Sequence, residues 1–299
     1  MINTTYKTDI YYDELLLLPL DNFIFSQGTG FLHSGMKYLF LFLILFYTSV
    51  RAQKNPGPRS VAMGSAGVAL RDIWSLQQNP SGMAGIEKSK FGIAYERHLL
   101  DQELSTQTVL FAFPFSKNVF GFSFERYGFT ECREQHAGIA FARKFGNALS
   151  LAIGFKYHQL SIGGYGSSKA FSAEAGFQYD VNEKFTLASH IANPGRSRYE
   201  DLTGSNIPVR LSFGAAYRLS NKVSIISDVI KVLNSSTDLR FGVEYTIARL
   251  FSLRGGVSAN PFKQYAGFGF NYNHLTVDVS VSSNPTLGYS PQIALGYEF

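Results

Sequence analysis

A repeating pattern of period two runs through most of this chain and limits what it can fold into. From about residue 90 to the C-terminus, apolar residues alternate with polar or small ones. In residues 149–157, for example, Leu, Ile, Phe and Tyr alternate with Ser, Ala, Gly and Lys. Successive side chains of a strand point to opposite faces of the sheet. Each such segment therefore predicts a strand with one apolar face and one polar or small face.

About fourteen of these segments follow one another, and most are joined by about two to six residues. They cover residues 90–99, 103–115, 118–129, 133–145, 148–162, 169–181, 185–193, 208–219, 223–233, 237–248, 251–260, 264–273, 275–284 and 290–299. The longest break runs roughly from Pro194 to Pro208. No helical pattern separates the segments, which excludes a parallel α/β sheet. We expect consecutive strands to pair antiparallel.

Both a soluble β-sandwich and a transmembrane β-barrel are consistent with this pattern. The segments average about ten residues, enough to cross a bilayer when tilted, and their even number is typical of bacterial barrels. Closure also removes the open edges that would make so many strands prone to aggregation. Aromatic residues gather toward segment ends, as interface girdles do; these are Phe113, Phe115, Tyr127, Phe129, Tyr179, Tyr217, Tyr297 and Phe299. We therefore predict an all-β, antiparallel up-and-down transmembrane barrel over residues 90–299.

The composition agrees with that fold and excludes several others. Charged residues make up 16% of the chain and aromatic residues 15%, whereas disordered segments are rich in charge and poor in aromatics. Cys132 is the one cysteine, so a disulfide framework within the chain is excluded. The 27 basic and 22 acidic residues give a net charge of +5. This excess is too small to indicate a nucleic-acid partner.

A targeting segment lies inside the N-terminal region. Residues 36–52 combine Lys37, an apolar run of about 11 residues and small residues before a cleavage point at Ala52, which is the pattern of a secretory signal peptide. The run is shorter than the about 20 residues of a membrane-spanning helix. We interpret residues 1–35 as an upstream extension absent from the mature protein; a cytosolic extension before a signal anchor is the alternative.

The C-terminus adds a second signal. The last segment alternates apolar residues and finishes with Tyr297 and Phe299. This ending resembles the signal that outer-membrane barrels present to their assembly machinery. The chain is thus expected to contact that machinery and the lipid of the outer membrane.

Residues 53–89, between the signal peptide and the first strand, are expected to form a plug inside the lumen. Glycine and alanine let a backbone pack closely against a barrel wall, and Asn79 before Pro80 is expected to be extended and to begin a turn. A flexible leader is the alternative. The motif that we assign to this plug or hatch consists of Gly64, Gly67, Asp72, Asn79, Pro80 and Gly82.

These residues also carry a family resemblance. The small-residue run 63–69, Asp72 and the run 79–84 resemble the N-terminal segment of the FadL-like superfamily of outer-membrane proteins, which includes the PorV/PorQ-type barrels of the type IX secretion system. Ser81 replaces the alanine of the family motif, and the stretch from Asn193 to Tyr217 resembles the second half of these barrels. The resemblance spans residues 59–299. It implies a fourteen-stranded barrel with its N-terminal segment in the lumen.

The sequence predicts no catalytic site, no metal site and no cofactor. No H-E-x-x-H or G-x-S-x-G motif occurs. Five histidines lie beyond the signal peptide without ligand spacing, and we expect His158 to be a solvated lumen residue. Cys132 is interpreted as an isolated thiol.

Charged residues of both signs fall on the polar faces of the strands. A selective channel would group one sign in a constriction, so we interpret the mixture as ion pairs that hold the wall rigid. The lumen charge network that we expect consists of Glu125, Glu174, Arg210, Arg240, Glu244 and Asp278.

Three functions remain open at this stage. The favoured one is a non-enzymatic, PorV/PorQ-like accessory or anchoring component of protein secretion or surface attachment, with secretion-system proteins as partners. The first alternative is a FadL-like transporter of hydrophobic small molecules across the outer membrane. The third is a barrel enzyme or a purely structural protein. About 247 residues follow Ala52, so the loops between fourteen strands must be short. Short loops favour the secretion role over a transporter that captures its ligand with long loops.

Removal of the signal peptide can be tested directly. We expect N-terminal sequencing of the mature protein to start near Gln53, because cleavage follows small residues such as Ala52. Recovery of residues 1–35 in the mature protein would contradict this interpretation.

Overall fold

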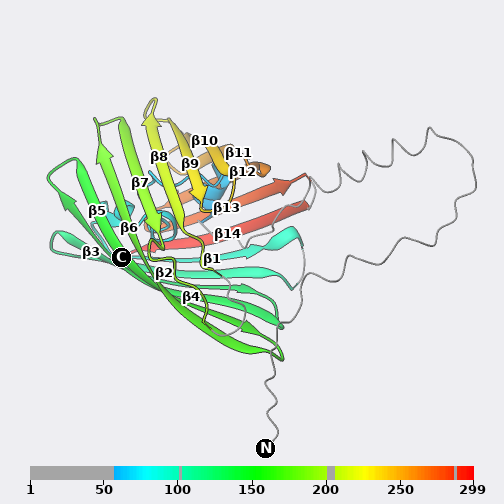
Figure 1. Ribbon diagram of the computed structural model, residues 1–299. Coiled ribbons are helices and arrows are strands. Elements are labelled where there is room, and N and C mark those ends of the chain that lie inside the picture. The colour runs from blue at the N-terminus through cyan, green and yellow to red at the C-terminus, as the bar shows by residue number, and fades with distance from the viewer. Residues whose placement is uncertain (1–56, 101–102, 201–205, 286–287) are drawn as a thin grey trace, which may run out of the picture. The chain divides into compact units, whose positions relative to one another are not determined.

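The strands of the chain close into a single barrel (Figure 1). The computed structural model describes residues 57–100, 103–200, 206–285 and 288–299. Within these residues, fourteen strands pair in chain order, and β14 returns to pair antiparallel with β1. The predicted antiparallel up-and-down barrel is therefore confirmed.

The strand bounds lie close to those predicted from the alternation. They are β1 (Lys90–Arg97), β2 (Ser105–Phe115), β3 (Asn118–Gly128), β4 (Cys132–Phe145), β5 (Leu149–Ile162), β6 (Gly166–Asp180), β7 (Phe185–Ala192), β8 (Arg210–Arg218), β9 (Val223–Val232), β10 (Thr237–Ala248), β11 (Phe251–Ala259), β12 (Phe262–Tyr272), β13 (Leu275–Asn284) and β14 (Gly288–Glu298). The largest difference is at β6, predicted from residue 169. Its ladder with β5 extends to the pair Ile162↔Gly166, beyond the apolar alternation.

The two rims of the barrel differ. One rim, here called the turn end, carries the C-terminus, the start of β1 and tight turns such as 116–117 and 249–250. The other, the loop end, carries the short 3-10 helix η2 (His98–Leu100) and the longest connection, residues 193–209. Within the described part of that connection, Asn193 donates side-chain hydrogen bonds to the carbonyls of Ser197 and Ile207.

Burial alternates along the strands as the sequence predicts. On β5, the outward Ile153 and Phe155 are 54% and 57% exposed, whereas Ala152, Lys156 and His158 between and beyond them are buried. The exposed side of the sheet is thus apolar, and the lumen side is small or polar. This is the arrangement of a barrel whose outer surface meets lipid.

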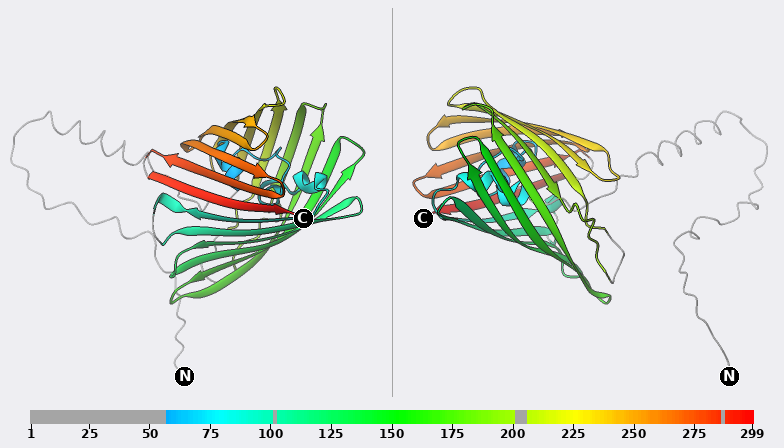
Figure 2. Two further views of the ribbon diagram at one scale, coloured as in Figure 1. Left: turned by 180° about the vertical axis from the view of Figure 1, so that it is seen from behind. Right: turned by 60° about the vertical axis from the view of Figure 1, so that its left-hand side comes forward.

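Residues 57–89 lie inside the ring of strands, as the sequence predicts for a lumen plug. They form the helices α2 (Pro58–Ala62) and α3 (Ser75–Gln78) and the 3-10 helix η1 (Pro80–Gly85). Both views of Figure 2 show these blue and cyan coils enclosed by the strands. α2 contacts β11 to β14, and η1 contacts β3 to β6. We call residues 57–89 the plug.

The start of η1 follows from its sequence. Asn79 is extended, with φ −151 and ψ 98, as expected before Pro80. Its side-chain oxygen accepts hydrogen bonds from the backbone N–H and the hydroxyl of Ser81. This cap satisfies a donor at the helix N-terminus that has no partner within the helix.

The predicted extension over residues 1–35 and the signal peptide over residues 36–52 lie outside the described residues. Within the described ranges, no helix has the length and hydropathy needed to cross a membrane.

Barrel closure predicts a simple gel behaviour. We expect the folded protein in SDS to migrate differently before and after boiling, because a closed hydrogen-bonded barrel resists SDS until heated. Identical migration of the two samples, with recovery in the soluble fraction, would contradict a membrane barrel.

Candidate functional site

The small residues of the plug lie where its backbone touches the wall. Gly64 has φ +75, and a Cβ there would lie 2.5 Å from the carbonyl oxygen of Phe241 and 2.6 Å from that of Val257. Only glycine combines this conformation with so close an approach. The predicted role of Gly64 in close packing thus has a specific partner, the β10–β11 wall.

A buried carboxylate from the wall holds the next turn of the plug. Oδ2 of Asp228, on β9, accepts hydrogen bonds from the backbone N–H groups of Gly67 (2.7 Å) and Val68 (3.1 Å). Asp228 has no exposed surface. Asp228 was not among the predicted site residues. The sequence feature that could have indicated it is an acidic residue between Ile226 and Ile230, on the inward face of the strand.

An ion-pair chain ties α2 to three strands near the turn end. Arg59 donates to Asp72 at 3.0 Å and to both oxygens of Glu244, at 2.8 and 3.0 Å. Arg254, on β11, donates to Glu244 at 2.6 Å and to Asp278 at 2.5 Å. We call these five residues the arginine chain. It brings together three predicted residues, Asp72, Glu244 and Asp278, through two arginines that were not assigned to the site.

The charge of Arg59 is stable in this place. Burial disfavours its charged form, but the carboxylates of Glu244 and Asp72 outweigh that effect and raise the pKa of the guanidinium above its ordinary value. The fork-shaped contact with Glu244 is the strong, directional form of an ion pair. The arginine chain therefore fixes both the position and the orientation of α2.

A second polar anchor lies on β6. Arg71 donates to Asp180 at 2.8 Å and to Gln178 at 3.0 Å, and the amide of Gln178 donates to the carbonyls of Val68 and Leu70. Asn79 donates to the carbonyls of Val68 (2.8 Å) and Phe177 (3.2 Å). Asn79 thus links two parts of the plug to the wall.

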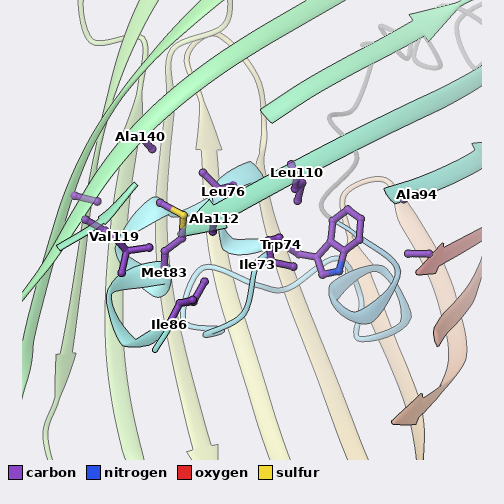
Figure 3. Packing of buried hydrophobic residues seen from close by; sticks show 13 residues of the cluster. Ile73, Trp74, Leu76, Met83, Ile86, Ala94, Leu110, Ala112, Val119 and Ala140 are labelled. Atoms are coloured by element: carbon purple, nitrogen blue, oxygen red, sulfur yellow. The ribbon is translucent and has the colours of Figure 1, made fainter. Parts of the chain in front are cut away.

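The opposite face of the plug is apolar (Figure 3). Ile73, Trp74, Leu76, Met83 and Ile86 pack there against small wall residues in one buried cluster. The wall residues are Ala94 on β1, Leu110 and Ala112 on β2, Val119 on β3, Ala140 and Ala142 on β4, Ala152 on β5 and Ala294 on β14. The plug therefore makes its polar contacts toward β6–β13, beside smaller apolar clusters with Ile226 on β9 and Ala188 on β7, and packs through apolar contacts against β14 and β1–β5.

The remaining predicted lumen charges form a separate group nearer the loop end. Glu174 lies 3.1 Å from Lys156 and 3.3 Å from His190. Arg240 contacts Asp238 at 2.7 Å and donates to the carbonyl of Ser65 at 2.8 Å. Arg210 interacts electrostatically with Arg240, Glu174 and Glu125 across the lumen. The six predicted charges thus divide between this group and the arginine chain.

Two further predicted features have different outcomes. His158 is 1% exposed and therefore is not a solvated lumen residue as expected. Its imidazole is covered because it pairs with His136 on the neighbouring strand. Tyr297 and Phe299 are 46% and 63% exposed beside the turn end, where their rings stack at 5.1 Å. Their role in assembly stays a prediction.

A cavity of about 580 Å³ opens between the plug and the wall. It is lined by plug residues Arg59, Leu70 and Arg71 and by β6–β10 residues that include Asp180, Arg218 and Glu244. It lies at the turn end, because turn residues such as Asn147, Asn182 and Asn221 also line it. The volume is in the range of small-molecule sites. Over the described ranges, no group of three or more His, Cys, Asp or Glu side chains could hold a metal ion.

Comparison with solved structures places the fold. The toluene transporter TodX of Pseudomonas putida aligns with a TM-score of 0.67 and 11% identity, over 84% of this chain and 99% of that one. The toluene transporter TbuX of Ralstonia pickettii gives 0.64 and 12%, over 81% and 98%. A FadL homologue of Pseudomonas aeruginosa gives 0.61 and 12%, also over 81% and 98%.

These likenesses establish the class of fold: the chain has the barrel of FadL-type outer-membrane channels. The identities are too low to carry more than the fold. No protein-family model matches the sequence, and no curated protein matches it.

The arginine chain can be tested with a matched pair of variants. Glu244→Gln should lower the free energy of unfolding by about 2 kcal/mol, because the buried Arg254 and the partly exposed Arg59 both lose a charged acceptor. It should also raise single-channel conductance by loosening α2. Urea unfolding in micelles and planar-bilayer recordings measure the two effects.

Glu298→Gln is the control. Its carboxylate pairs with Lys88 and Lys90 at the exposed rim, where an ion pair contributes about 0–1 kcal/mol. Equal effects of the two substitutions would show that the arginine chain does not hold the plug.

Proposed function

We propose that this protein is an outer-membrane channel for hydrophobic small molecules, kept closed to water by its plug. The supporting observation is a fourteen-stranded barrel with an internal plug, in the fold of the toluene transporters TodX and TbuX. The apolar outer face of the strands agrees with a lipid setting. The turn end, with its short connections, then faces the periplasm and the loop end faces outward.

The two-sided plug suits such a role. Its polar side is held by the arginine chain, Asp228 and Gln178, which position it firmly. Its apolar side is buried against β14 and β1–β5, and an apolar solute that displaced those contacts would be more stable there than in water. The cavity of about 580 Å³ beside the plug provides space at the periplasmic mouth.

The function that the sequence favoured, a PorV/PorQ-like accessory or anchoring component of secretion, is a second candidate. Its support is the shortness of connections such as 129–131 and 163–165 at the loop end, which provide little material for a ligand-capture site. The structural likenesses favour transport instead. Neither candidate requires an enzymatic activity, and secretion-system partners remain a proposal.

Uptake measurements test the transport proposal. We expect cells that lack other hydrocarbon channels to take up radiolabelled toluene several-fold faster when they express this protein. Uptake of a polar solute of similar size should stay at the level of vector-only cells, because the plug closes the aqueous path. Toluene uptake at the vector level, with a heat-shifting barrel present in the membrane, would contradict the proposal.

Deletion of residues 59–86 provides the matched variant. The shortened barrel should admit the polar solute and show a higher single-channel conductance, because the plug residues no longer fill the lumen. A pull-down from the native membrane, analysed in parallel, distinguishes the second candidate: specific recovery of secretion components together with vector-level toluene uptake would favour it.

A further inference from the structure

Two histidines on neighbouring strands face each other inside the lumen near the loop end. His136 on β4 and His158 on β5 are direct partners in the antiparallel ladder. Their Nδ1 atoms lie 2.8 Å apart, and the rings meet edge to face with centroids 4.7 Å apart. The two imidazoles thus approach each other through the same type of ring nitrogen, at hydrogen-bond distance. Neither the contacts of the plug nor the proposed transport involves this pair.

The outer nitrogen of each ring is held by another side chain. Nε2 of His158 lies 2.7 Å from the hydroxyl of Ser172 on β6, and Nε2 of His136 lies 3.3 Å from a carboxylate oxygen of Glu134. The same oxygen of Glu134 accepts a hydrogen bond from Tyr199 at 2.9 Å. Metal-binding histidines typically donate their second ring N–H to a carboxylate or similar acceptor, which fixes the ring and its tautomer.

This support has a consequence for the inner nitrogens. The hydroxyl of Ser172 can donate to Nε2 of His158, and one Nδ1 then donates its hydrogen to the other. When both Nε2 atoms instead carry their hydrogens, toward Glu134 and Ser172, both Nδ1 atoms present lone pairs to each other. Two lone pairs at 2.8 Å repel unless a cation lies between them. The cation can be a shared proton or a metal ion.

The spacing suits a metal ion of one class. Metal–imidazole bonds are about 2.0 Å long, and Cu²⁺ and Ni²⁺ prefer square-planar or tetragonal nitrogen sites. Two nitrogens in adjacent corners of such a square are about 2.8 Å apart, from the bond length and the right angle alone. We propose that His136 and His158 form a two-histidine site for a divalent transition-metal ion of the Cu²⁺ or Ni²⁺ type.

The pair is partly exposed on its β4 side. The side chain of His136 is 12% exposed and that of Glu134 25% exposed, so water from the lumen can reach the pair from the β4 side. Water would complete the coordination, since the described residues offer no third protein ligand at this point. The nearby Lys156 is paired with Glu174 at 3.1 Å, which offsets its charge.

Titration of Cu²⁺ into the refolded full chain in detergent tests the site. Electron paramagnetic resonance should show one equivalent of Cu²⁺ with hyperfine splitting from two imidazole nitrogens. His136→Asn and His158→Asn, made separately, should each leave one nitrogen and weaken binding at least tenfold. Ser172→Ala, which keeps both imidazoles, should keep the two-nitrogen signal with an affinity lowered several-fold.

The controls separate this site from other copper ligands. His274→Asn removes a histidine from the β12–β13 turn at the opposite rim and should change neither the signal nor the affinity. The N-terminal amine is the same in every variant, so its contribution cancels. Each variant is first checked for the gel shift of a folded barrel. If only one of the two histidine variants folds, that variant alone is sufficient to test the site. Absence of a two-nitrogen signal, or a signal that survives His136→Asn and His158→Asn, would overturn the proposal.

Discussion

The pairing of β1 with β14 is the constraint on which the other features depend. Once the first and last strands share a ladder from Lys90↔Glu298 to Glu96↔Gln292, no strand of the sheet has an open edge. Every strand then has one face outside and one inside. The outer face can be apolar because lipid covers it, and the inner face must enclose whatever fills the lumen.

The filling is achieved by two different means. Near the turn end, small wall residues such as Ala112 and Ala142 leave room that the plug occupies with Trp74, Leu76 and Met83. Nearer the loop end, longer charged side chains such as Lys156, Glu174 and Arg240 extend into the lumen and pair. Buried charges of this kind need partners because each isolated one is costly in a low dielectric. The mixed signs observed in the sequence reflect that need.

The barrel could be predicted from the sequence because the alternation of apolar and polar residues is visible within each strand alone. The alternation of residues within one strand shows which side chains face outward and which face inward. The bounds of β10, residues 237–248, could therefore be predicted without any long-range information. The site was only partly predictable. Asp72, Asn79 and Glu244 were recognisable as polar residues in notable positions. Arg59, Gln178 and Asp228, which also hold the plug, were not recognisable. Their contacts depend on how the plug folds against strands 110 to 185 residues away in the sequence. The burial of His158 depends in the same way on the register that places His136 beside it.

The two unlike sides of the plug give it a preferred direction of movement. Separating its polar side from β6–β13 would take Arg59 away from Glu244, which keeps Arg254, and would leave the buried carboxylate of Asp228 without the N–H groups of Gly67 and Val68. A buried charge that loses its partners costs several kcal/mol. Separating its apolar side from β1–β5 would break apolar contacts that an apolar molecule can replace, such as those of Leu76 and Met83. In the proposed transport, the polar side would therefore act as the hinge and the apolar side as the edge that opens. A nonpolar solute that entered along β1–β5 would replace the contacts of the side chains it displaced, whereas water would not.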